Sequence, residues 1–148
     1  MLRIEKTITI DVPVEEVFAY VANPRNEPEW QINLMSIHDV TGEGVGQHYR
    51  WDFKMAGVLL HGESNVTEYV LNRRYQNQSR GGAVSTWTST FEPQGAGTRW
   101  TLTVDYALPI PVVGRVAEAV LLKQNDKGLE LSMQSVKDKL EHPQPIPA

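Results

Sequence analysis

The sequence predicts an α+β fold, in which a curved antiparallel sheet of about seven strands wraps round one long C-terminal helix. Strand-like alternation fills most of the chain as far as residue 108, and helical signals interrupt it only after the first strand. A helical stretch of about 30 residues follows. Because helices and strands do not alternate, this order favours the α+β class over the α/β class. One helix cannot fill the inner face of a wide, curved sheet, so the pattern also predicts a cavity between them.

The chain opens with a half-buried strand. Within residues 2–10 the aliphatic residues Leu2, Ile4, Ile8 and Ile10 share one parity, and charged or threonine side chains fill the other. Asp11 then offers a capping oxygen at the start of a helix over 14–21. The inner residues of this helix are Val17, Phe18 and Val21. Asn23–Pro24 ends it, and a second short helical turn leads to Trp30.

Residues 35–108 are predicted to be consecutive strands and turns. Alternation is clear over 49–55, 58–66, 87–91 and 100–108, and glycine-rich turns separate these segments. The last strand is the clearest, because one of its faces carries only bulky apolar residues: Trp100, Leu102, Val104, Tyr106 and Leu108.

A long helix is predicted between Pro109–Pro111, which end the sheet, and Pro143. Its apolar residues fall mostly three or four positions apart: Val113, Val116, Val120, Leu129, Met133, Val136 and Leu140. We predict a single domain over residues 1–142 and a flexible, proline-rich tail over 143–148.

Composition excludes several classes of function. The 148 residues include no cysteine, which rules out disulfides, thiol nucleophiles and cysteine-ligated zinc. With 14 basic against 18 acidic residues, the chain is not expected to bind nucleic acid. No apolar run approaches the ~20 residues of a membrane helix, and the charged N-terminus is not a signal peptide. We therefore expect a cytoplasmic protein with no integral membrane segment, whose oligomeric state the sequence leaves open.

Several short motifs in order carry a family resemblance. These are residues 10–18 (IDVPVEEVF), Asn23–Pro24 through Trp30, Gly44–Gly46, residues 91–99 (FEPQGAGTR), and Tyr106–Pro109 followed by Gly114. Together, over about residues 3–141, they resemble the SRPBCC, or START-like, superfamily, in its polyketide cyclase/dehydratase-like branch. The resemblance implies a helix-grip fold with a hydrophobic cavity for a lipid-like or polycyclic molecule. It does not imply a reaction.

Aromatic residues are the main candidates for lining a ligand site, because ligand pockets are mostly apolar. All of them lie at or before Tyr106, so the closing helix has only smaller side chains. The predicted ligand-binding residues are Trp30, Tyr49, Trp51, Phe53, Trp87, Phe91, Trp100 and Tyr106. Plain core packing is the alternative for each of them, and Trp30 is expected near the cavity mouth.

Catalytic and metal-binding constellations are weak. The four histidines lack metal-ligand spacing, so we expect no metal. Neither of the glycine-rich turns, at residues 42–46 and 95–97, has the form of a phosphate loop, and we expect no cofactor. His61 and Glu63 share a strand face and would make an acid–base pair, but their parity places them on the solvent side. Catalytic residues remain unknown. Arg73, Arg74 and Arg80 form the main basic cluster, which is interpreted as solvated.

Two polar groups have ambiguous positions. The strand over 75–80 brings either Gln76, Gln78 and Arg80, or Tyr75, Asn77 and Ser79, toward the cavity, unless it is an edge strand. Residues 124–126 (Gln-Asn-Asp) pose the same question in the middle of the long helix: they either face the cavity or form a solvated turn of the helix.

Three functions remain open. The first is binding, and possible transport or presentation, of a small hydrophobic molecule between sheet and helix. The second is a cyclase or dehydratase that uses the same cavity. The third is a protein-interaction or regulatory module.

Overall fold

The computed structural model describes residues 2–55, 57–81, 84–107 and 115–143. The predicted sheet end at Pro109–Pro111, the junction at Gly114 and most of the predicted tail lie outside these residues. The same holds for the side chains of Met55 and of residues 115–122, which include Val116 and Val120.

The seven strands of the described chain form one antiparallel sheet, in the order β1-β7-β6-β5-β4-β3-β2. They are β1 (Leu2–Ile10), β2 (Leu34–Thr41), β3 (His48–Met55), β4 (Val58–Val70), β5 (Arg74–Arg80), β6 (Val84–Gln94) and β7 (Gly97–Ala107). From β2 to β7 each strand pairs with the next one along the chain, and β1 pairs with β7 so that Leu2 lies opposite Tyr106.

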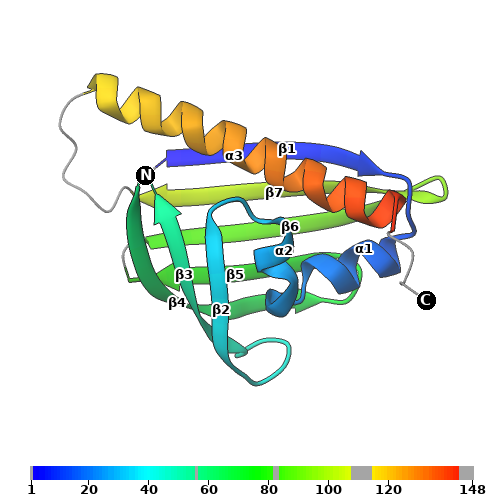
Figure 1. The fold of residues 1–148 in the computed structure, drawn as a ribbon. Helices are drawn as coiled ribbons and strands as arrows, with labels where there is room; N and C mark the ends of the chain where they lie inside the picture. Colours follow the sequence, from blue (N-terminus) through cyan, green and yellow to red (C-terminus); the bar gives the residue numbers. More distant parts are fainter. Residues whose placement is uncertain (1, 56, 82–83, 108–114, 144–148) are drawn as a thin grey trace, which may run out of the picture.

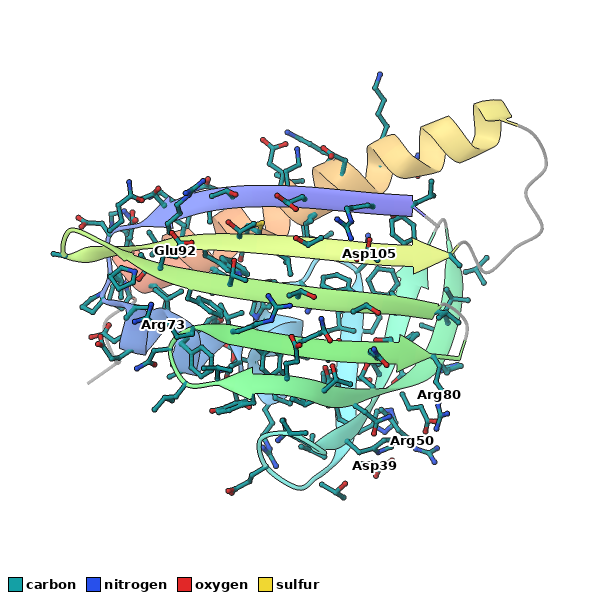
Figure 2. The ribbon with its side chains drawn as sticks, turned by 180° about the vertical axis from the view of Figure 1, so that it is seen from behind. Asp39, Arg50, Arg73, Arg80, Glu92 and Asp105 are labelled. Atoms are coloured by element: carbon teal, nitrogen blue, oxygen red, sulfur yellow. The ribbon has the colours of Figure 1, made fainter. Side chains whose placement is uncertain are left out.

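The helices all lie on one side of the curved sheet (Figure 1). They are α1 (Val14–Val21), α2 (Glu27–Trp30) and α3 (Arg115–Glu141), with a single 3₁₀ turn, η1 (Pro24–Asn26), before α2. Seen from behind, the strands lie in front of the helices (Figure 2). The predicted α+β fold is confirmed.

Helix α1 has the predicted bounds and buries the predicted residues, together with Val14. The predicted cap at Asp11 is wrong, because Pro13 is the N-cap residue and the helix has no side-chain capping bond. The backbone N–H of Asp11 instead donates to Glu141 Oε2 at 2.7 Å. Asp11 therefore connects the end of β1 to the last turn of α3.

Strand β5 is an inner strand that pairs with both β4 and β6, so the edge-strand alternative is wrong. Tyr75 and Asn77 are buried on the helix-covered face, while Gln78 and Arg80 are exposed. A polar residue such as Asn77 thus faces the interior.

The end of the sheet beneath α1 is solidly packed with aromatic rings. Phe91 lies edge-on to Phe18, with ring centroids 5.2 Å apart, and stacks in parallel with Trp100 at 6.3 Å. Trp30 meets Trp100 edge-on at 5.6 Å. Such edge-to-face and offset contacts are favoured by the charge distribution of aromatic rings. This packed end fixes α1 and α2 relative to the sheet.

Within the described residues, no helix is both long enough and apolar enough to cross a membrane.

Candidate functional site

A cavity of about 150 Å³ lies at the other end of the fold, between the sheet, the segment joining α2 to β2, and α3. Its apolar wall is formed mainly by Ile4, Leu34, Trp51, Phe53, Leu60, Trp87, Val104 and Leu129. A volume of ~150 Å³ with an apolar lining is enough to hold a benzene ring. The space predicted between sheet and helix is therefore present, and it is mostly apolar.

Trp51 takes its place in the wall because the residue opposite it on β4 is a glycine. Trp51 pairs in register with Gly62, and a Cβ on Gly62 would lie 2.2 Å from Cζ2 of the Trp51 ring. Real Cβ atoms do not approach other atoms so closely, so only glycine leaves room for the ring in this position.

Serine residues satisfy the two indole N–H groups of the cavity wall. Trp51 Nε1 donates to Ser64 Oγ at 3.1 Å, and Trp87 Nε1 donates to Ser85 Oγ at 3.0 Å. Ser64 in turn shares a hydrogen bond of 2.6 Å with Ser79. Because the indole donors are paired with the protein, the ring faces of both tryptophans are left as apolar surface.

The exposed residues of the described cavity lining lie in the segment after α2 and in the middle of α3, so we infer that the mouth of the cavity lies between these two segments. Ile32, which is 38% exposed, and Asn33 lie on one side of this mouth, and the exposed Gln124 lies on the other. The backbone N–H of Ile32 donates to Ser132 Oγ at 2.9 Å, which fastens this segment to α3.

Asn125 connects the middle of α3 to the last strand. Its Nδ2 donates to Tyr106 Oη at 3.1 Å, and both residues line the cavity. Gln124 and Asn125 are therefore part of the cavity wall, whereas Asp126 pairs with Lys6 at 2.8 Å.

Glu27, the first residue of α2, places a carboxyl group in the cavity wall although the residue is only 5% exposed. Tyr49 Oη donates to its Oε1 at 3.5 Å, which is long for such a bond. Among the described residues that line the cavity there is no lysine, arginine, histidine or aspartate. Burial without a cationic partner raises the pKa of Glu27 to about 8, against the smaller opposing effect of the Tyr49 hydrogen bond.

A second, much smaller cavity of about 10 Å³ lies beside Glu27, and Trp30, Tyr75 and Asn77 also line it. Trp30 Nε1 is buried and has no hydrogen-bond partner. Burial is the main cause that raises the pKa of the Tyr75 hydroxyl, and the charge of Glu27 adds to it. This inner end of the site therefore combines a carboxyl group with a buried, unpaired N–H donor.

The predicted ligand-binding residues occupy three different places in the structure. Tyr49, Trp51, Phe53, Trp87 and Tyr106 line the main cavity. Phe91 and Trp100 lie outside its lining and belong to the packed end. Trp30 lines the smaller cavity, and its expected place at the mouth is wrong, since it is 4% exposed and covered by Trp100.

The His61 and Glu63 pair does not form. His61 Nδ1 lies 2.5 Å from Asp52 Oδ1, and Glu63 binds Arg80 Nε at 2.7 Å and His48 Nε2 at 3.1 Å. None of these residues lines the cavity. No group of three or more histidine, aspartate or glutamate residues in the described chain is arranged to hold a metal ion.

The predicted arginine cluster is also dispersed. Figure 2 shows Arg73 and Arg80 at opposite ends of the sheet, with Arg80 near Arg50 and Asp39 at one corner. Arg74 is paired with Glu68.

Sequence reasoning missed Glu27. In the sequence it is one of two acids that flank Pro28, where first-turn acids of a short helix are common. A helix of one turn has no periodicity that would show which acid points inward. The only signal available was its place within the Asn23–Trp30 motif.

Comparison with known proteins supports the fold. No curated protein matches the chain in sequence. Among solved structures, TTHA0849 from Thermus thermophilus is 21% identical, with a TM-score of 0.84 over 97% of this chain and 100% of that one. A START superfamily protein from Mycobacterium smegmatis is 16% identical, with a TM-score of 0.80 over 96% and 99% of the two chains.

An enzyme is also among the similar structures. The Zhui aromatase/cyclase from Streptomyces sp. R1128 is 14% identical, with a TM-score of 0.74 over 98% of this chain and 99% of that one. At such identities the likeness shows the fold alone. The model of one family, described as polyketide cyclase/dehydrase and lipid transport, matches residues 1–141. The chain therefore belongs to the polyketide cyclase/dehydrase and lipid transport family.

Proposed function

We propose that this protein binds a small, largely apolar molecule in the cavity between the sheet and α3. The observation that carries the proposal is the cavity itself: about 150 Å³ of mostly apolar space, enclosed by Trp51, Phe53, Trp87 and Leu129. Apolar surface that leaves water contributes ~25 cal/mol per Å², so the rings of this wall favour an apolar guest. A single ring fills the observed volume, and a longer, lipid-like or polycyclic ligand would extend through the mouth beside Ile32.

Gly128 provides the sharpest test, because it lines the cavity and a Cβ added there would meet no atom within 4 Å. Gly128→Leu should place a side chain in the cavity without disturbing its neighbours. Calorimetric titration with ethylbenzene should show binding to the wild type and at least about tenfold weaker binding to Gly128→Leu, the equivalent of ~1.4 kcal/mol.

Lys139→Leu is the matched control, since Lys139 lies exposed on the same helix and outside the cavity lining. It should bind ethylbenzene like the wild type. Equal affinity of the wild type and Gly128→Leu would refute binding at this cavity.

A catalytic role is a second candidate, and Glu27 is the observation that favours it. A carboxyl group with a pKa raised by burial to about 8 can exchange a proton near neutral pH, as general acids and bases do. Dehydration of a β-hydroxy ketone removes a proton from the α carbon and hydroxide from the β carbon, giving an enone and water. The minor fraction of Glu27 that is ionised near neutral pH would accept the first proton and return it to the departing hydroxyl.

The absorbance of the enone formed from 4-hydroxy-4-phenylbutan-2-one measures this activity. If the candidate is right, the wild type accelerates enone formation and Glu27→Gln does not, while both proteins bind ethylbenzene. A wild-type rate equal to that of the buffer would remove the candidate for this substrate class and leave the binding proposal intact.

A further inference from the structure

The inner end of the cavity is rich in hydrogen-bond donors, and the described residues place no cation there. Glu27 is the one acidic residue among the described residues of the wall. The titratable groups that face it are the hydroxyls of Tyr49 from β3 and Tyr75 from β5, and burial raises the pKa of both. The described residues that α3 brings to the wall, such as Gln124, Asn125 and Ser132, are neutral.

A carboxylate in this position would be a buried charge without a partner, which costs several kcal/mol. The single hydrogen bond from Tyr49, at 3.5 Å, is too long to offset that cost. Glu27 therefore keeps its proton at neutral pH and is itself a donor. Trp30 Nε1, three residues further along α2, is a second buried donor and has no acceptor.

Donors that lack acceptors select a ligand by its chemistry. A carbonyl oxygen has two lone pairs and no charge. It can therefore accept a hydrogen bond from Glu27 without the cost of removing an ion from water. A carboxylate ligand would bring a negative charge into a site with no cation. An ammonium group would bring only further donors, and it would have to ionise Glu27 to be stabilised.

We propose that the ligand of this cavity is a neutral molecule with a carbonyl group at its inner end, to which the protonated carboxyl of Glu27 donates a hydrogen bond. This inference rests on the proposed binding of an apolar ligand and adds the group by which that ligand is oriented. The apolar wall supplies affinity, and Glu27 supplies the preference for a carbonyl compound over the corresponding hydrocarbon.

Acetophenone and ethylbenzene are suitable probes, because they differ only in a carbonyl group that replaces a methylene. At pH 6 the wild type should bind acetophenone about three- to tenfold more tightly than ethylbenzene, as expected for one hydrogen bond. This preference should fall at pH 9, where Glu27 loses the proton that it donates.

Two variants distinguish the contribution of the Glu27 carboxyl group to binding from that of the apolar cavity wall. Glu27→Gln keeps an N–H donor that does not titrate, so its preference for acetophenone should be the same at pH 6 and pH 9. Glu27→Leu has no donor, so it should bind acetophenone more weakly than ethylbenzene, because the buried carbonyl would lose its hydrogen bonds to water. Its ethylbenzene affinity should be at least that of the wild type.

The outcomes distinguish this inference from the proposed function. If the wild type binds both probes equally, or if Glu27→Leu keeps the preference for acetophenone, the inference is wrong while cavity binding stands. Benzylamine that binds the wild type more tightly than acetophenone, and loses this advantage in Glu27→Leu, would also overturn it. Failure of the wild type to bind either probe would contradict the proposed function, and this inference with it.

Discussion

Glu27 shows how one residue can reduce the stability of the fold at the site that we propose for a ligand. Its carboxyl group is buried beside Tyr49, and no cation lies with it among the described residues of the cavity wall, an arrangement that favours the protonated form. Between the ordinary pKa of 4.5 and the pKa of about 8 that burial produces, the folded protein holds a proton that the unfolded chain releases. The free energy of unfolding must therefore fall as pH rises through this window.

Glu27→Gln removes this titration and tests it directly. Relative to the variant, the wild type should lose about 3 kcal/mol of stability between pH 4 and pH 7, because each unit of pKa shift corresponds to about 1.4 kcal/mol. Urea denaturation of both proteins at the two pH values measures the difference. A constant difference would mean that Glu27 is ionised in the folded protein at neutral pH.

Gly62 is a second residue that shapes the cavity, because its missing side chain leaves room for the Trp51 ring. Gly62→Ala should force the Trp51 ring to move and should destabilise the fold by about 1–3 kcal/mol, as overpacking does. The near-ultraviolet circular dichroism of the tryptophans should change as well.

Gly128→Ala is the matched glycine substitution, and its effect should have the opposite sign. Its Cβ meets no neighbour, and alanine is favoured over glycine within a helix by about 1 kcal/mol. If both alanine variants proved equally stable, the close contact between Gly62 and Trp51 would not constrain the fold.

At the scale of elements, the strands were the most predictable part of the sequence. In β7 every second residue from Trp100 to Tyr106 is buried, and this alternation is visible directly in the sequence. The position of β5 could not be predicted from its own residues, because both of its faces are polar. Only its pairing with β4 and β6 turns Tyr75 and Asn77 toward the interior.

Helix ends were less predictable, because their stabilising contacts come from distant residues. Asp11 is close to α1 in sequence but accepts no capping bond there, and its N–H binds Glu141 at the far end of the chain. Lys137 Nζ adds bonds to Thr9 O at 2.8 Å and to Glu141 Oε2 at 2.6 Å. These contacts hold the last turns of α3 against the end of β1.

Glu141→Gln should loosen this attachment by removing the charge. The hydrogen bond from Asp11 is the main cause that lowers the pKa of Glu141. The Glu141 carboxylate therefore stabilises the fold above its ordinary pKa, and this stabilisation is lost as pH falls through the lowered pKa. At pH 7 the variant should be about 1–2 kcal/mol less stable than the wild type in urea denaturation.

The difference between Glu141→Gln and the wild type should close in acid, where both side chains are neutral. A difference that persists there would show that the side chain contributes by packing and not by its charge.

For the whole molecule, the fold consists of a packed end and a hollow end. Phe91 and Trp100 fill the packed end with stacked rings, whereas Trp51 and Trp87 line open space. The sequence predicted a cavity between an aromatic sheet face and a helix without aromatic residues. It could not predict which of the rings on the strands line the cavity, because these rings all share the inward parity of their strands and differ only in their place along the sheet.

The family assignment shows the architecture of the protein but does not identify a ligand. Any preference for a ligand must be argued from the residues of the cavity wall. The similar solved structures, at 14–21% identity in the three cases described, share the fold with this chain. Tryptophans paired with serines, a buried carboxyl group with no cationic partner among the described residues, and a helical glycine at the wall are features of this sequence. They give the cavity its apolar surface, its polar inner end and its free volume.

A crystal structure of the wild-type protein with acetophenone tests the central claim most directly. We expect electron density for the ring between Trp87 and Leu129, with the carbonyl oxygen within hydrogen-bond distance of the Glu27 carboxyl group. A saturated crystal with the ligand elsewhere on the molecule, and with this cavity unchanged, would contradict it.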